Sequence, residues 1–271
     1  MVEKFVEEED LKLSYLIFGE GSETVVCLHG HGKNAEDFLF LKDRGIRVIS
    51  INLFLHGKST FSNTRINDNL ITKNDVEKLL RKLLIKEKVE QFHLIAYSQG
   101  GRFALSILPY FSVNILSLHL LAIDGLNDKN FYSWSQRRWW ARKLFKRWTE
   151  KPNELISIAK FLVRIKLIHP KIVDFLNFYA ADRDKITLAY KTWSAFRKLR
   201  PNPKILKPYL NNKSMRFKLI IGERDKIITA KSAKNFLQEV KREDALIIID
   251  AGHDFFRPEI IEIIDKEIKF I

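Results

Sequence analysis

The sequence contains very little cysteine: a single residue, Cys27, in a chain of 271. One cysteine forms no disulfide within the chain, and its position in an apolar stretch indicates a small core residue rather than a reactive thiol. A chain of this length with 46% hydrophobic residues buries about three quarters of its unfolded surface, so it needs no disulfide to stay folded.

Long hydrophobic runs are also missing. No stretch approaches the roughly eighteen apolar residues of a membrane span. The first ten residues are acidic, and they lack the basic start and the apolar run of a signal peptide. We find neither an internal repeat nor a low-complexity tract. These absences lead us to expect a cytoplasmic protein.

Negative charge is scarce in one part of the chain only. Residues 126–215 hold 21 Lys and Arg against 6 Asp and Glu, whereas the remaining residues hold 26 against 27. Nearly all of the net charge of +14 therefore belongs to one segment. Three interpretations remain open: the segment attracts an anionic small-molecule substrate, it contacts an acidic membrane surface, or its charges are an ordinary solvated surface.

Within that segment, residues 134–148 have the pattern of a basic amphipathic helix. Its apolar positions recur at spacings of three and four residues and are Trp140, Ala141, Leu144, Phe145 and Trp148. Such a helix can lie at a membrane interface, but we favour packing of the stripe onto the core, so peripheral membrane contact is not the favoured interpretation. No nucleic-acid-binding motif is present, and we expect no nucleic-acid partner.

Outside the basic segment, strand patterns alternate with helical patterns. The expected strands are near 3–7, 11–18, 24–28, 46–51, 92–97, 117–123, 216–221 and 245–250, and the expected helices near 35–44, 74–88, 99–110, 230–241 and 258–270. Alternation of this kind predicts an α/β fold with a mostly parallel sheet of about eight strands covered by helices. We expect residues 1–126 and 216–271 to form this core and residues 127–215 to form a basic helical cap.

The most informative motif is Ala96-Tyr97-Ser98-Gln99-Gly100-Gly101. An apolar run ends at Ser98 and a helical pattern follows, which is typical of a nucleophile elbow. The turn is sharp and strained, so it needs small residues two positions to either side of the serine, here Ala96 and Gly100.

Three other apolar runs end in residues that suit the same site. One precedes the glycine-rich turn His29-Gly30-His31-Gly32, another precedes Asp225, and a third precedes His253. The carboxyl ends of parallel strands share one edge of a sheet, where sites are assembled. Asp124 also ends a predicted strand and is an alternative to Asp225.

Taken in chain order, these motifs resemble those of the α/β-hydrolases, in which the serine precedes the acid and the acid precedes the histidine. A weaker match is the loop Asn52–Ser59, which resembles the family's Asp-x-x-Gly-His-Gly-x-Ser but has Asn52 and Leu55 where aspartate and glycine are usual. The resemblance covers most of the chain outside its middle third, and its pattern favours Asp225 over Asp124 as the acid.

The resemblance implies a serine hydrolase that acts on an ester or other acyl substrate. Ser98 would be the nucleophile, His253 its base and Asp225 the acid that orients the histidine. The backbone N–H groups of His31 and Gln99 would form the oxyanion hole. This chemistry requires no metal and no organic cofactor.

A shorter resemblance leaves the reaction open. Residues 97–102 are similar to the Tyr-Ser-x-Gly-Gly-Arg stretch of menaquinone-pathway lyases (SHCHC synthase-like enzymes), which share the α/β-hydrolase fold and bind an anion with arginines. Tyr97 and Arg102 are therefore candidate substrate-binding residues. We expect ester or acyl hydrolysis first, carbon–carbon lysis as the alternative, and a non-catalytic binding module as a third interpretation.

Overall fold

The computed structural model describes residues 1–126, 138–167, 170, 173, 176–177, 180–212, 214–268 and 270. The chain divides into two compact units. The first unit falls within residues 1–62, 71–127 and 198–271, and the second within 63–70 and 128–197.

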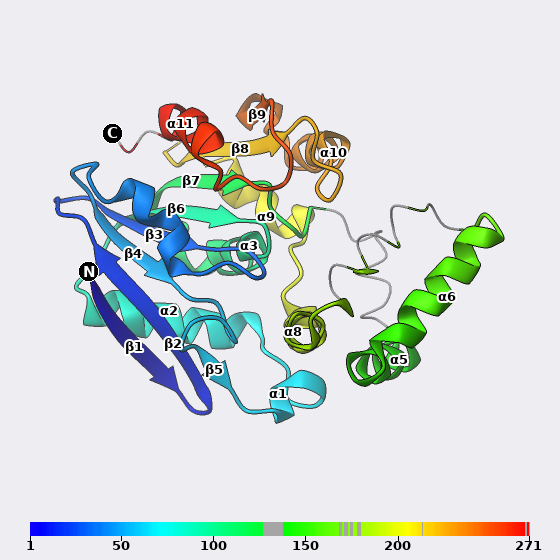
Figure 1. Cartoon of the computed structure of the whole chain (residues 1–271). Helices are drawn as coiled ribbons and strands as arrows, with labels where there is room; N and C mark the ends of the chain where they lie inside the picture. Colours follow the sequence, from blue (N-terminus) through cyan, green and yellow to red (C-terminus); the bar gives the residue numbers. More distant parts are fainter. Residues whose placement is uncertain are drawn as a thin grey trace. The chain divides into compact units, whose positions relative to one another are not determined.

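The first unit is built on a nine-stranded sheet (Figure 1). Its strands are β1 (Val2–Glu8), β2 (Leu11–Phe18), β3 (Thr24–Leu28), β4 (Arg47–Ile51), β5 (Thr60–Phe61), β6 (Phe92–Tyr97), β7 (Ile115–Leu121), β8 (Arg216–Gly222) and β9 (Leu246–Ile249). They lie in the order β1-β2-β4-β3-β6-β7-β8-β9, and β5 pairs with β2. The pairings among β1, β2, β4 and β5 are antiparallel, whereas those from β4 through β3 and β6 to β9 are parallel. The prediction of a mostly parallel sheet is confirmed.

Helices of the first unit connect these strands. They are η1 (Ala35–Leu41, a 3-10 helix), α2 (Lys73–Lys86), α3 (Gly100–Phe111), α9 (Pro203–Leu210), α10 (Ala230–Val240), η3 (Glu243–Ala245) and α11 (Pro258–Glu267). Capping side chains precede four of them: Asn34 before η1, Thr72 before α2, Asn202 before α9 and Thr229 before α10 each accept a hydrogen bond from a backbone N–H of the first turn. The two-residue strand β5 was not predicted, because two residues are too few to show a period.

Successive side chains of the central strands point to opposite faces of the sheet, and helices cover both faces. Val25, Cys27 and Ile95 belong to one buried cluster with side chains of η1 and α11. Val26 and Leu28 point the other way and meet side chains of α2 and α3. Both faces of these strands are apolar, as expected for a parallel sheet with helices on each side.

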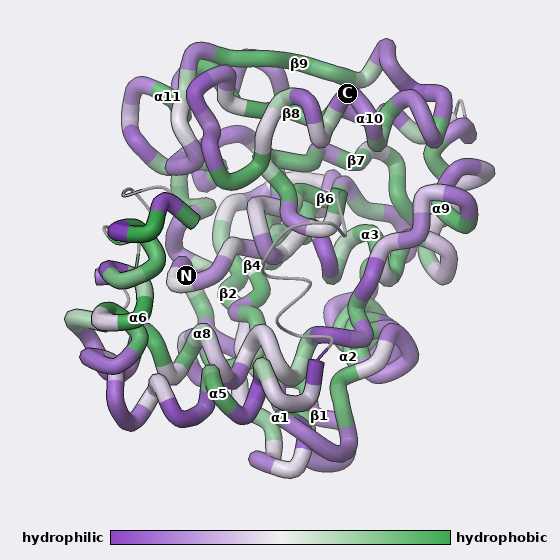
Figure 2. The backbone as a smooth tube through the Cα atoms, turned by 90° about the vertical axis from the view of Figure 1, so that its right-hand side faces the viewer, coloured by the Kyte–Doolittle hydropathy of each residue, from purple (hydrophilic) through white to green (hydrophobic). Residues whose placement is uncertain are grey.

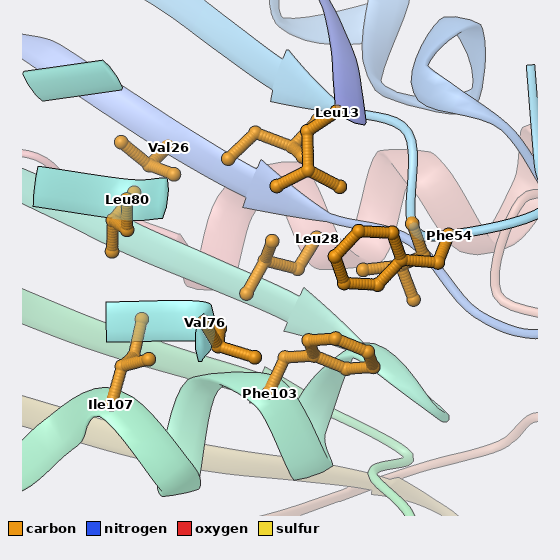
Figure 3. A pocket seen from close by; sticks show the side chains of 10 residues that line it. Leu13, Val26, Leu28, Phe54, Val76, Leu80, Phe103 and Ile107 are labelled. Atoms are coloured by element: carbon orange, nitrogen blue, oxygen red, sulfur yellow. The ribbon is translucent and has the colours of Figure 1, made fainter. Parts of the chain in front are cut away.

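A small void of about 20 Å³ lies between that second face and the helices α2 and α3 (Figure 3). Its lining is entirely apolar and consists of Leu13, Val26, Leu28, Ile51, Leu53, Phe54, Val76, Leu80, Phe103 and Ile107. An apolar void of this size has room for about one water and no polar partner for it, so it is a packing defect of the core rather than a substrate pocket.

The secondary structure described in the second unit is helical. Its elements are α1 (Thr64–Asn67), α5 (Trp139–Glu150), α6 (Pro152–Arg164), α8 (Arg183–Ala195) and most of η2 (Phe196–Lys198). The ring of Phe145 on α5 contacts Tyr190 and Trp193 of α8, with ring centroids 5.8 and 5.5 Å apart. Part of the predicted stripe therefore packs within the unit. Residues 134–137 at the start of that predicted helix lie outside the described residues.

The unit boundaries differ from the expected core and cap. Residues 198–215 belong to the first unit, because α9 packs on α3 and α10. Residues 63–70 belong to the second, where the guanidinium of Arg197 donates to the carbonyls of Ile66 and Asn67 at 2.7 Å. Both differences come from contacts between segments far apart in the sequence.

Candidate active site

Ser98 follows the last residue of β6 and has a left-handed backbone, with φ of +47°. This conformation costs a residue with a Cβ roughly 1 to 2 kcal/mol, so it persists only where neighbouring contacts hold it. The Ser98 N–H donates to the carbonyl of Leu121 at 3.0 Å, and the Ser98 carbonyl accepts from the N–H of Asp124 at 2.8 Å. Strand β7 and the loop after it therefore hold the strained residue from one side.

The glycines around Ser98 are required by close approach. A Cβ at Gly100 would lie 2.3 Å from the carbonyl oxygen of Leu28, and one at Gly101 would lie 2.3 Å from Cβ of Ile123. A Cβ at Gly30 would come within 2.9 Å of the Ser98 Cβ. The His-Gly turn and the elbow are thus packed directly against each other.

His253 and Asp225 lie in line with Ser98. The Oγ of Ser98 is 3.0 Å from Nε2 of His253, and Nδ1 of His253 is 2.7 Å from Oδ2 of Asp225. The side chain of Asp225 is fully buried, while that of His253 is 21% exposed. This arrangement allows a proton to pass from the hydroxyl to the imidazole while the carboxylate orients the ring.

The other oxygen of Asp225 is held by its own loop. Oδ1 accepts from the backbone N–H groups of Ile227 and Ile228 at 2.8 and 2.9 Å. The carboxylate is therefore fixed between two backbone donors and the histidine, and it cannot turn away from the ring without losing both.

Asp124, the alternative acid, is bound elsewhere. Its Oδ2 accepts from Nε of Arg102 at 2.5 Å, and its Oδ1 accepts from a terminal guanidinium nitrogen of Arg102 at 3.1 Å. Arg102 is only 1% exposed. The geometry brings Asp225, not Asp124, to His253, and it turns the Arg102 guanidinium toward Asp124.

Tyr97, the other candidate for substrate binding, is 3% exposed. Its hydroxyl donates to the backbone carbonyl of His253 at 2.7 Å, and its ring centroid lies 5.6 Å from that of His253. Burial raises the pKa of Tyr97 well above its usual range, with the carboxylates of Asp254 and Asp225 adding to the effect, so the hydroxyl stays a donor. Sequence reasoning missed this support for the histidine loop, because residues 97 and 253 are far apart in the chain.

The two residues expected to stabilise an oxyanion flank Ser98. Gln99 is the N-cap of α3, so its N–H belongs to the positive end of a helix of twelve residues. His31 lies between Gly30, which packs against Ser98, and Gly32, whose N–H donates to Nε2 of His56 at 2.9 Å. Both backbone segments therefore adjoin Ser98.

Two buried histidines brace the glycine-rich turn. His29 accepts from the N–H of Leu53 at 2.9 Å through Nε2, and its Nδ1 donates to the Gly30 carbonyl at 2.7 Å. His56 accepts from Gly32 in the same way, and its Nδ1 donates to the Phe54 carbonyl at 3.0 Å. Each ring uses one nitrogen as acceptor, which requires the neutral form. Burial lowers the pKa of His29 to about 3, and it also lowers that of His56.

The Asn52–Ser59 loop accommodates its two departures from the family pattern. Asn52 accepts from the N–H of Ala35 at 2.8 Å, and its amide donates to the Ser14 hydroxyl at 2.9 Å. Leu55, where glycine is usual, has φ of +64° and so adopts a backbone that favours glycine. The loop therefore holds one strained residue, and the hydrogen bonds of Asn52 tie it to the segments around Ser14 and Ala35.

Comparisons with known proteins agree with this architecture. The esterase from Thermogutta terrifontis, solved with malate bound, is 16% identical and superposes with a TM-score of 0.69 over 98% of this chain and 97% of its own. An esterase from Exiguobacterium antarcticum is 19% identical, with a TM-score of 0.62 over 98% of each chain. At sequence identities this low, the two superpositions establish similarity of fold alone.

Sequence comparison gives a partial match to a known protein and a match to a family model. Over 128 residues the chain is 23% identical to the dihydrolipoyllysine-residue acetyltransferase component of the acetoin cleaving system of Cupriavidus necator, covering 46% of this chain but only 33% of that protein. A family model described as the alpha/beta hydrolase fold matches residues 23–258, which is most of the chain. The protein therefore belongs to the alpha/beta hydrolase fold family.

Proposed function

We propose that this protein is a serine hydrolase that cleaves an ester or another acyl substrate. The observation that carries the proposal is the continuous hydrogen-bonded chain from the Ser98 hydroxyl through His253 to the buried Asp225. Membership of the alpha/beta hydrolase fold family and the fold shared with two esterases support the same reaction class.

In the proposed reaction, Ser98 Oγ attacks the acyl carbon while His253 Nε2 takes the hydroxyl proton. The tetrahedral oxyanion accepts hydrogen bonds from the backbone N–H groups of Gln99 and His31, and a donor of this kind is worth roughly 3 to 4 kcal/mol. His253 then gives its proton to the leaving oxygen, and the acyl-enzyme remains. Water, deprotonated by the same ring, releases the acid and restores Ser98.

Asp225 has two roles in this scheme. It accepts the Nδ1–H of His253, so Nε2 faces Ser98 as the acceptor, and it stabilises the imidazolium that forms during attack. Its two backbone donors keep the carboxylate in place through the cycle.

We further propose that the acyl substrate is anionic. The net charge of +14 favours approach of anions, and the similar esterase from Thermogutta terrifontis was solved with malate, a dicarboxylate, bound. Lowering the ionic strength should lower the KM for an acidic ester and leave that for a neutral ester unchanged. Equal salt dependence for both esters would count against an anionic substrate.

A fluorophosphonate probe tests the nucleophile directly. We expect the probe to label the wild-type protein at Ser98, and Ser98→Ala and His253→Ala to abolish labelling. Asp250→Asn is the matched control, because it changes an exposed carboxylate three residues before His253. We expect the probe to label this variant normally. An unreactive Ser98 in folded protein would instead support a non-catalytic binding module.

A panel of p-nitrophenyl esters separates hydrolysis from carbon–carbon lysis. Turnover that disappears in Ser98→Ala supports the hydrolase, whereas inactivity on every ester together with turnover of the menaquinone-pathway intermediate supports the lyase. Arg102 gives the lyase interpretation little support, because its guanidinium is buried and bound to Asp124.

A further inference from the structure

Helix α6 of the second unit has an apolar stripe on its exposed side. Ile158, Phe161 and Ile165 follow one another at spacings of three and four residues and are 44%, 59% and 47% exposed. Leu155 and Ala159, on the adjoining part of the helix surface, are buried. Only part of the apolar surface of α6 is therefore used inside the unit.

Large apolar side chains are also exposed at both ends of the α5–α6 segment, residues 138–167. Trp139 at the start of α5 is 70% exposed, and Leu167 just beyond α6 is 67% exposed. Hydrophobic and hydrophilic positions alternate along both helices (Figure 2). Scattered exposed apolar residues are ordinary, but several on neighbouring helices suggest an interaction surface.

The same segment is strongly basic. Residues 138–167 contain nine Lys and Arg against two Asp and Glu. One of the two acids, Glu154, is paired with Arg147 through contacts of 2.7 and 2.9 Å. Arg164 lies three residues after Phe161 and so neighbours it on the surface of α6, Lys160 directly precedes Phe161, and both cations are exposed. Positive charge therefore borders the exposed apolar side chains.

We infer that the α5–α6 segment binds the surface of an anionic lipid membrane. Tryptophan, phenylalanine and isoleucine can enter the boundary between headgroups and acyl chains, while Lys and Arg bind anionic headgroups. In the part of the chain that the structure describes, no helix is long and apolar enough to cross a bilayer. The contact is accordingly peripheral.

Two other partners fit the surface less well. A second copy of the chain, packed symmetrically, would bring nine cations of one segment against nine of the other. A nucleic acid would match the charge, but its phosphates would leave Ile158, Phe161 and Ile165 without an apolar partner. A lipid surface satisfies both the charge and the apolar stripe.

Vesicle sedimentation tests the inference on the full-length protein. We expect binding to vesicles of phosphatidylcholine with phosphatidylglycerol, weak binding to phosphatidylcholine alone, and release as salt is raised. Vesicles with brominated acyl chains should quench the tryptophan fluorescence, and Trp139→Phe should reduce that quenching. Ser98→Ala should bind as the wild type does, so this result is independent of the proposed hydrolase activity.

Matched variants separate the apolar and the electrostatic parts. Phe161→Asp should weaken binding at least about tenfold, since an inserted phenylalanine is replaced by an anion. Its control is Ile85→Asp on α2 of the first unit, where the side chain is 72% exposed, and we expect no change there.

The charge variants follow the same design. Lys160→Glu with Arg164→Glu should weaken binding by roughly fivefold for each lost cation and further for each added anion. Lys231→Glu with Lys234→Glu on α10 makes the same change in net charge on the first unit and should have a much smaller effect.

Three results would overturn the inference. The first is no binding to anionic vesicles at low salt, and the second is equal loss of binding in Phe161→Asp and its control. The third is a concentration-dependent dimer, seen by light scattering, that Phe161→Asp dissociates while vesicle binding stays unchanged; this would assign the surface to a second copy.

Discussion

The buried ion pair between Arg102 and Asp124 makes the sharpest prediction about stability. Arg102 lies in the first turn of α3, is 1% exposed, and donates to both carboxylate oxygens of Asp124. The backbone N–H of Asp124 donates in turn to the carbonyl of Ser98 at 2.8 Å. Changing Asp124→Asn keeps the size of the side chain and removes the carboxylate charge that pairs with the buried guanidinium.

The size of the effect follows from burial. Removing one partner of a buried ion pair costs about 3 to 5 kcal/mol. The side chain of Asp124 is 16% exposed, so water reaches it from one side. The asparagine also keeps one acceptor oxygen, and we therefore expect the lower end, about 3 kcal/mol. Because Arg102→Met removes the buried positive charge, adding it to Asp124→Asn should recover about 2 kcal/mol of that loss.

Urea unfolding of the two single variants and the double variant measures this coupling. Asp250→Asn is the control, because Asp250 pairs with Arg224 on the surface, where the two side chains are 70% and 64% exposed. We expect that control to unfold as the wild type does. A loss below about 1 kcal/mol for Asp124→Asn, or losses that simply add in the double variant, would refute the reasoning.

Two further predictions concern the core of the first unit. Burial, with smaller contributions from nearby histidines, lowers the pKa of His29, His31 and His119 from 6.5 to about 3. The unfolded chain therefore binds protons first as the pH falls. Stability present above pH 6.5 is lost between about pH 6.5 and 3, by about 1.4 kcal/mol per pH unit for each histidine. Urea unfolding at pH 7 and 5.5 should show this loss, and a dependence of the unfolding free energy on pH that His119→Gln leaves unchanged would contradict it. Val76→Ile adds one methylene into the void of Figure 3 and should raise the free energy of unfolding by about 0.8 kcal/mol, whereas a lower value would mean that the void cannot accept the extra atom.

Much of the fold could be predicted, because the apolar residues that a strand or helix buries recur at a regular spacing in the sequence. The strands β2, β3 and β6 have the bounds expected from their apolar runs, β4 and β8 differ by one residue at one end, and β9 is shorter by one residue at each end. Helix α2 begins at its capping residue Thr72, as side-chain chemistry favours. The order of strands in the sheet and the pairing of β5 with β2 depend on contacts between distant segments, so no local period reveals them.

The sequence by itself determined the kinds of residue that the site contains, because Ser98, Asp225 and His253 each follow an apolar run, and the loops after parallel strands share one edge of the sheet. Only the tertiary structure decided which carboxylate meets the histidine. Asp124 and Asp225 follow similar apolar runs, but a buried arginine binds the first, while two backbone N–H groups hold the second against His253. A carboxylate pairs with the donors that surround it, and those donors come from parts of the chain that only folding brings together.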